Sequence, residues 1–131
     1  EKPVTLLQIW VIPRENGVKP RYDQLKIADN AVDNEFQQIV SPNPEDAGVW
    51  IHQDAWFHIG NFTQDSSKKY EIKKSENGVY VFVISGSVKI GDTILNQRDA
   101  LGITETESFD MEIFANSEVL LIEVPMKLPK L

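Results

Sequence analysis

Short apolar segments separated by tight-turn residues fill the second half of the chain, and this punctuation limits the possible folds more than any other feature. Segments of three to eight residues alternate with Asn-Gly, Ser-Gly, Gly-Asp and Asn-Ser pairs. The clearest case is KIGDTI (89–94), where a two-residue Gly-Asp loop supplies the positive φ that hairpin turns require. No segment keeps its apolar residues at helical spacing over three turns. We therefore predict an all-β domain, a sandwich or barrel of antiparallel strands.

Five other segments carry specific expectations. Residues 4–12 are predicted to form a strand that is ended by a proline. Residues 21–28 have the pattern of a short strand or a single helical turn, and the run 48–62 has the pattern of one long strand. The polar residues 63–69 are predicted to form a loop, and the tail 127–131 is predicted to fray.

Composition places the chain among single globular domains. Its 131 residues are 41% hydrophobic, with seven prolines and seven glycines, as expected for one folded core. The net charge is −7 and the lysines are scattered, so we expect no nucleic-acid contact, because a phosphate backbone binds a concentrated positive surface. No apolar run approaches the roughly 20 residues that span a bilayer, so we expect no membrane contact.

The absence of cysteine excludes disulfides, thiolate zinc sites and cysteine nucleophiles. It also suits a reducing compartment, and no charged-then-apolar leader opens the chain. We therefore expect a soluble, cytoplasmic protein. The chain starts at Glu1 rather than at methionine, which fits a piece of a longer protein.

Both histidines lie in VWIHQDAWFHIG (49–60), with Asp54 between them, and this composition suggests a metal site. In an unbroken strand, however, His52 and His58 are about 20 Å apart, at roughly 3.3 Å per residue. Ligand atoms of one ion lie about 2.0–2.2 Å from it, so these two histidines cannot share a metal unless the strand is broken. We predict no metal site. The remote alternative is a metalloenzyme that uses His52 and Asp54 with acids from neighbouring strands.

Other chemistry finds little support. No G-x-S-x-G or P-loop pattern occurs, and acid pairs such as Glu105 with Glu107 lie in predicted turns, so we predict no catalytic residue. Aromatic residues provide a candidate pocket for a flat apolar ligand. Its predicted members are Trp50, His52, Trp56, Tyr80 and Phe82. The alternative is that such residues simply fill a small barrel.

Three segments carry a family resemblance. LQIWVIPRENGVKPRYDQ (7–24) resembles the segment that opens the C-terminal half of pirin-like proteins, the two-cupin family that includes bacterial quercetin 2,3-dioxygenases. Residues 39–62 resemble the family's turn and strand with the HQD triplet, and residues 91–125 resemble its closing hairpins. The resemblance implies that residues 1–131 form a single C-terminal cupin, an antiparallel β-barrel of the double-stranded β-helix or jelly-roll type.

The family's iron lies in the N-terminal cupin, which is missing here. The resemblance places Ile72, Lys74, Gly78 and a residue near Thr104 at the equivalent ligand positions, and these types do not form a ligand set. It therefore implies a metal-free domain without a cofactor, which supports the N-terminal iron cupin. The alternative is a non-catalytic binding module for a flat aromatic ligand such as a flavonol. Whether the parent protein is a quercetin 2,3-dioxygenase stays open.

The resemblance also implies partners. The N-terminal cupin of the same protein is the expected one. Residues 1–12 are expected to link the two cupins or to swap, because Val4–Ile12 is apolar on both faces, like a strand that is covered on both sides. Without the other cupin such a strand is a free edge, so we expect a homodimer through Val4–Ile12.

Overall fold

The computed structural model describes residues 2–127, which form one 3-10 turn and ten β-strands in two sheets. The elements are η1 (Ile27–Asn30), β1 (Phe36–Ser41), β2 (Val49–Trp50), β3 (Trp56–Phe62), β4 (Ser66–Glu71), β5 (Gly78–Ser85), β6 (Val88–Ile90), β7 (Thr93–Leu95), β8 (Ala100–Ile103), β9 (Ser108–Ile113) and β10 (Ser117–Val124). The six-stranded sheet has the order β2-β1-β3-β10-β5-β8, and the four-stranded sheet has the order β4-β9-β6-β7. The strand pairs are antiparallel except for β1 with β2.

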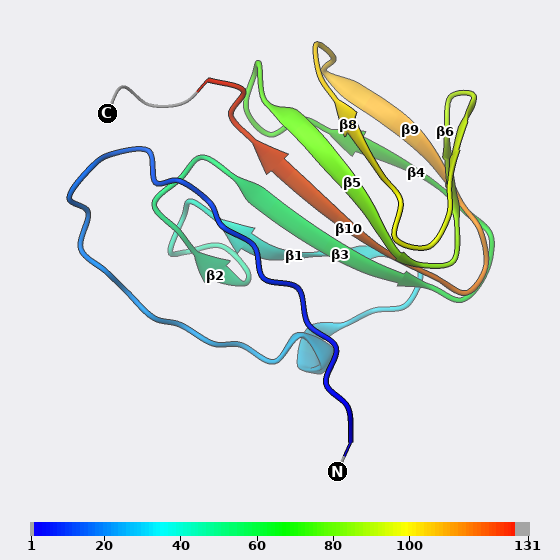
Figure 1. Cartoon of the computed structure of the whole chain (residues 1–131), viewed down its shortest axis with the longest axis horizontal. Helices are drawn as coiled ribbons and strands as arrows, with labels where there is room; N and C mark the ends of the chain where they lie inside the picture. The colour runs from blue at the N-terminus through cyan, green and yellow to red at the C-terminus, as the bar shows by residue number, and fades with distance from the viewer. Residues whose placement is uncertain (1, 128–131) are drawn as a thin grey trace.

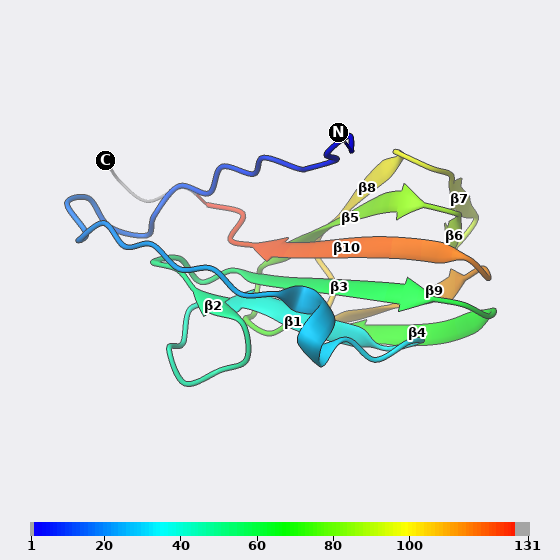
Figure 2. The ribbon, with the colours of Figure 1, turned by 90° about the horizontal axis from the view of Figure 1, so that it is seen from below.

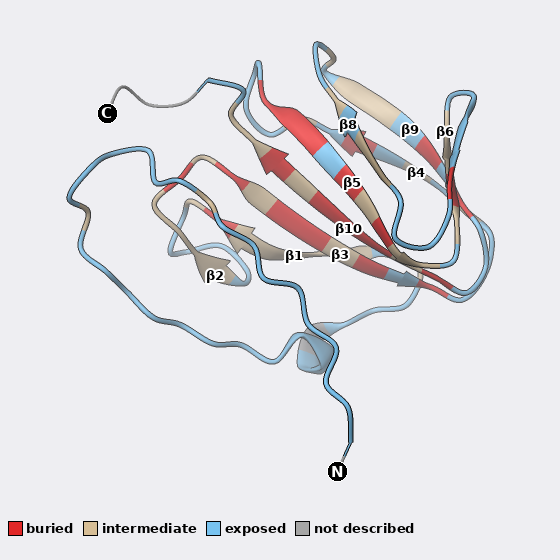
Figure 3. Cartoon of the chain, in the orientation of Figure 1, coloured by how far each residue is buried: buried red, intermediate tan, exposed pale blue. Residues whose placement is uncertain are grey.

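The two sheets pack face to face, and the hydrophobic core lies between them (Figures 1 and 2). Every second residue is buried along β5 and β10, at Val79, Val81 and Val83 and at Val119, Leu121 and Glu123 (Figure 3), and two residues between such positions, Phe57 of β3 and Leu120 of β10, are buried as well. This period of two gives the sheet one inner and one outer face. The buried apolar cluster consists of Phe62, Tyr70, Val79, Val81, Val83, Val88, Leu95, Met111, Ile113, Val119 and Leu121. The predicted all-β fold is confirmed as a two-sheet jelly roll.

The hairpin at KIGDTI is also confirmed. β6 and β7 pair with Ile90 opposite Thr93, so the loop has two residues. Gly91 has a φ of 58°, the left-handed conformation that a primed hairpin turn requires and that glycine adopts at little cost.

Residues 4–12 do not form the predicted strand. They are extended, but no strand of the described chain pairs with them, and they cross the outer side of the six-stranded sheet, away from the four-stranded sheet (Figures 1 and 2). A strand needs a neighbouring backbone to complete its hydrogen bonds, and hydrophobicity alone does not provide one. We call Val4–Ile12 the arm. It is held at its end, where Gln53 Nε2 donates to the Ile12 carbonyl oxygen at 2.8 Å and the Arg14 N–H donates to the His52 carbonyl oxygen at 2.8 Å.

Residues 48–62 are not one strand either. The chain turns between β2 and β3, because the Ala55 N–H donates to the Gln53 carbonyl oxygen at 2.8 Å. The Gln53 side chain supports this turn by accepting the Asp54 N–H at 2.8 Å. The apolar alternation continues through the turn, which explains why the sequence predicted an unbroken strand. The distance of about 20 Å between His52 and His58 assumed that strand, so it does not apply.

Two further predictions need correction. Residues 63–69 are not a loop throughout, because β4 begins at Ser66 and pairs with β9, with Ser66 opposite Ile113. Pairing in the folded protein overrides the local polarity of this stretch. Residues 21–28 contain no strand, and the alternative helical turn forms at η1, which begins at Ile27.

The expected fraying of the tail falls on residues 128–131, outside the described residues, apart from Lys127. Within residues 2–127, no helix is long and apolar enough to cross a membrane.

Candidate functional site

Asp54, the acid of the HQD triplet, takes part in ion pairs. Its Oδ2 contacts the Lys74 ammonium, and its Oδ1 lies 3.4 Å from Arg14 Nη1. Within residues 2–127, no group of three His, Cys, Asp or Glu side chains is close enough together to hold a metal ion. Because the chain turns between β2 and β3, the distance of about 20 Å that was expected for an unbroken strand no longer separates His52 from His58. Even so, the structure does not bring His52, Asp54 and His58 together as a ligand set.

Trp50 and His52, two members of the predicted aromatic pocket, are neighbours. Their ring centroids are 4.9 Å apart with an interplanar angle of 78°. The Arg21 guanidinium lies 4.2 Å from the centre of the Trp50 ring and donates an N–H to the Trp50 carbonyl oxygen. This cation–π contact means that a side chain of the protein itself covers part of the tryptophan surface that we expected to meet a ligand.

The other three members lie on two faces of the six-stranded sheet. Tyr80 is opposite Ile122, whereas Trp56 is opposite Glu123. Successive residues of a strand point to opposite faces, so Trp56 faces inward with the buried Glu123, and Tyr80 and Phe82 face outward. The five predicted residues therefore do not surround one pocket.

His58 is buried on the inner face and is only 8% exposed. Its ring packs against the Tyr70 ring with 5.5 Å between centroids and an interplanar angle of 77°. Among the described residues, no group forms a hydrogen bond with the buried Nδ1. Burial, assisted by the positive charge of Lys73 and opposed by Glu123, lowers the pKa of His58 to about 4. The imidazole is therefore neutral at pH 7.

Glu123 holds one end of the sandwich together, and sequence analysis did not identify it. This fully buried carboxylate accepts hydrogen bonds from the Tyr70 hydroxyl at 2.7 Å and from Asn77 Nδ2 at 2.8 Å. It also accepts the backbone N–H groups of Lys73 at 2.9 Å and Lys74 at 3.1 Å. Burial and the bond to Glu123 raise the pKa of Tyr70 above its ordinary value. The available signal was one acid inside the apolar run VLLIEVP, at an inward position.

The positions of the family's iron ligands do not fit a metal in this chain. Two of them come together, since a Cβ placed on Gly78 would lie 3.0 Å from Thr104 Cγ2 and 2.6 Å from Met126 Sδ. Glycine and Ile72 have no ligand atom, however, and the ammonium of Lys74 is already engaged in an ion pair. This set of residues does not suit iron.

The arrangement of the two sheets is that of a cupin. A crystal structure of a cupin protein from Bacteroides fragilis matches with a TM-score of 0.53 and 16% identity, over 82% of this chain and 87% of that one. YhhW from Escherichia coli matches with a TM-score of 0.80 and 29% identity, over 92% of this chain and 50% of that one. Another crystal structure, of the bacterial pirin YhhW in complex with nickel(II), matches with a TM-score of 0.78 and 28% identity, over 88% of this chain and 48% of that one. The chain is therefore a cupin domain.

Within that class, the chain belongs to the quercetinase C-terminal cupin domain family, whose model matches residues 38–124. Quercetin 2,3-dioxygenase of Escherichia coli (strain K12) is 32% identical over 120 residues, which are 92% of this chain and 50% of that protein. The chain spans about half the length of the curated relatives that it matches. The resemblance to the C-terminal cupin of pirin-like proteins is confirmed.

Proposed function

We propose that this chain is the metal-free, non-catalytic C-terminal cupin of a two-cupin protein, and that it supports an N-terminal iron cupin by packing against it through the outer face of its six-stranded sheet. The match to a C-terminal domain model and to half of longer relatives supports the existence of a preceding half. Any quercetin 2,3-dioxygenase activity of the parent protein then belongs to that half.

The outer face of the sheet is the observation that carries this proposal. Two cross-strand rows of apolar side chains run over β3, β10 and β5. One row consists of Phe57, Ile122 and Tyr80, and the other of Ile59, Leu120 and Phe82. Tyr80 is 47% exposed, although the sheet continues on both sides of it. Phe57 and Leu120 are already buried within the chain, at 6% and 4% exposed, so the part of this face that is open to a partner is centred on Tyr80. An exposed apolar patch in the middle of a sheet is typical of a protein interface.

The arm lies on the same side of the molecule and adds to this surface (Figures 1 and 2). Its large apolar side chains are exposed, and Trp10 is 87% exposed. They are Val4, Leu6, Leu7, Ile9, Trp10 and Ile12. Because the hydrophobic effect favours removing such side chains from water, the proposal places the arm against the N-terminal half.

The first test is the mass of the isolated chain in solution. Without its other half, we expect the chain to form a homodimer through the outer face and the arm Val4–Ile12, so the mass from light scattering should rise with concentration. Tyr80→Glu places a charge in the face and should weaken the dimer about tenfold or more. Ile94→Glu is the matched control, because Ile94 is 57% exposed on β7 of the other sheet. A monomer at all concentrations, or equal effects of both variants, would contradict a docking role for this face.

Co-expression extends this test to the proposed partner. The chain and the polypeptide that precedes it in its gene, made as separate chains, should co-purify as a one-to-one complex. Tyr80→Glu should release the complex, whereas Ile94→Glu should leave it intact. A folded N-terminal half that never binds this chain would reject the supporting role.

A flavonol titration tests the competing binding module. We expect no saturable quench of tryptophan fluorescence when quercetin is added to the isolated chain, because Tyr80 and Phe82 face away from the side that Trp56 occupies. Free tryptophan at the same absorbance corrects for the inner-filter effect. A saturable quench that His52→Ala weakens would favour the binding module over the scaffold.

A further inference from the structure

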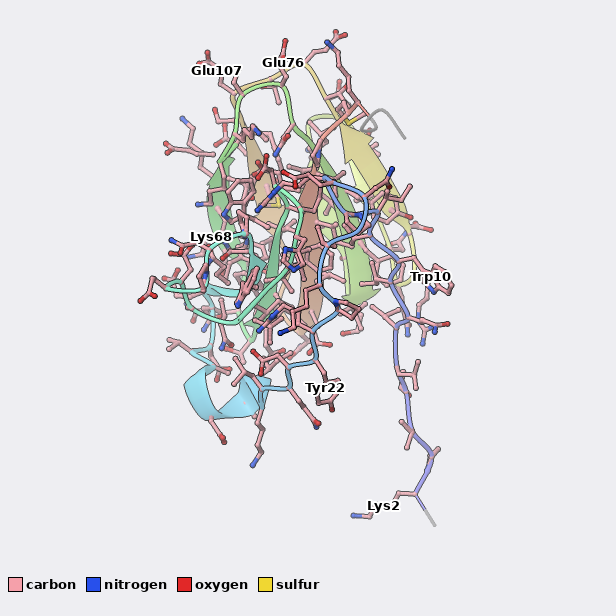
Figure 4. All side chains as sticks on the ribbon, turned by 90° about the vertical axis from the view of Figure 1, so that its left-hand side faces the viewer. Lys2, Trp10, Tyr22, Lys68, Glu76 and Glu107 are labelled. Atoms are coloured by element: carbon pink, nitrogen blue, oxygen red, sulfur yellow. The ribbon has the colours of Figure 1, made fainter. Side chains whose placement is uncertain are left out.

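A hollow of about 330 Å³ opens at the seam between the two sheets. β4 is an end strand of the four-stranded sheet. In the six-stranded sheet, β1 pairs with the short end strand β2 only at Val40 and Ser41, so the rest of that edge of β1 has no neighbouring strand within residues 2–127. No strand ladder of the described chain therefore joins the sheets here. Lys68 at this seam and Trp10 of the arm lie on opposite sides of the molecule (Figure 4). The hollow is thus separate from the proposed docking face.

Two buried polar residues reach the hollow from the core. His58 is 8% exposed and Tyr70 is 6% exposed, and both line it. The Tyr70 hydroxyl donates to Glu123, so it is already used. His58 Nδ1 has no partner among the described residues. Buried polar atoms are nearly always hydrogen-bonded, and an unsatisfied one costs about 1–3 kcal/mol, so His58 is a polar side chain in the wall of the hollow whose hydrogen-bonding capacity the described chain does not use fully.

Three lysines, Lys68, Lys69 and Lys73, outnumber the two acids Glu35 and Glu71 in the lining of the hollow. The Lys73 ammonium lies 5.7 Å from the centre of the Tyr70 ring, and within residues 2–127 it has no ion-pair partner. Lys68 Nζ lies 3.0 Å from a carboxylate oxygen of Glu35, whose side chain is 63% exposed. An exposed ion pair of this kind contributes little, so Lys68 can turn to another anion at small cost.

We propose that this hollow binds a small oxyanion, a carboxylate or a phosphate group, between the ammonium of Lys73 and the imidazole of His58. Charge-assisted hydrogen bonds from ammonium groups to such oxygens are among the strongest in proteins. The aromatic ring of Phe36 also lines the hollow and provides a surface for the apolar body of an organic carboxylate. The assignment does not depend on the docking role, because the two surfaces are separate.

An NMR titration of the whole chain at constant ionic strength tests this assignment, with sodium benzoate and inorganic phosphate as probes. We expect saturable shifts of the His58 imidazole signals with at least one probe. Benzoate alone would identify an organic carboxylate, and phosphate alone a phosphate group. Lys73→Met should weaken the binding about tenfold, the loss expected for one charge-assisted hydrogen bond.

Lys89→Met is the matched control, because Lys89 lies on β6, away from the seam. It should bind the probe as the wild type does. The Lys73→Met variant keeps the backbone N–H that donates to Glu123, and the same spectra show whether the variant protein is folded. Shifts of His58 that do not saturate, or equal affinities of the two variants, would overturn the proposal.

Discussion

Replacing Glu123 with leucine is expected to lower the free energy of unfolding by about 4 kcal/mol. The carboxylate accepts hydrogen bonds from the Tyr70 hydroxyl, from Asn77 Nδ2 and from the N–H groups of Lys73 and Lys74. Leucine has a similar volume but accepts none of them, so the buried side-chain donors of Tyr70 and Asn77 are left unsatisfied. Each unsatisfied buried donor costs about 1–3 kcal/mol, and removing one member of a buried charged network costs about 3–5 kcal/mol.

Urea unfolding followed by tryptophan fluorescence measures this loss. Glu118→Leu is the matched control on the same strand, and it should change the free energy by about 0.5 kcal/mol or less, because Glu118 is only partly buried. Glu123→Gln is a second variant, with a smaller loss. The amide nitrogen of the glutamine can take the place of Oε1, and the Tyr70 hydroxyl can then rotate and accept a hydrogen bond from this nitrogen. A Glu123→Leu protein within 1 kcal/mol of the wild type would mean that this network contributes little to stability.

The sequence predicted those parts of the fold that are encoded locally. The Gly-Asp loop of the β6–β7 hairpin could be predicted because a glycine at positive φ is a local requirement. The arm could not, because whether an apolar segment is a strand depends on which backbone lies beside it. Ser66 joins β4 for the same reason, since only the distant β9 makes this polar segment a strand.

The candidate site was harder to predict than the fold. Gln53 supports the turn that breaks the HQD strand, and no periodicity distinguishes such a side chain from one that packs in a sheet. Trp56 was grouped with Tyr80 and Phe82 although they lie on opposite faces of the sheet, because the sequence does not fix which face of each strand points inward and a register error of one residue exchanges the two faces. Glu123 was missed because its partners lie about fifty residues away in sequence. Side-chain networks of this kind are properties of the assembled core.

His58 should make the protein sensitive to acid. Burial lowers its pKa in the folded chain to about 4, whereas the unfolded chain has the ordinary value of 6.5. Between these values the unfolded state binds more protons than the folded state, so stability is complete above pH 6.5 and is lost as the pH falls to 4. A shift of one pKa unit corresponds to about 1.4 kcal/mol, so His58 should account for a loss of about 3 kcal/mol between pH 7 and pH 4.

The measurement is the free energy of unfolding against pH for matched variants. Carboxylates also titrate near pH 4, so the informative quantity is the difference from the wild type. His58→Gln should remove about 3 kcal/mol of the pH dependence, whatever its effect at neutral pH. The imidazole signals give a direct check, because a His58 that titrates near pH 6.5 in the folded chain would contradict its burial as a neutral group. Since Lys73 and Glu123 act on this pKa in opposite directions, Glu123→Gln should lower it further and Lys73→Met should raise it.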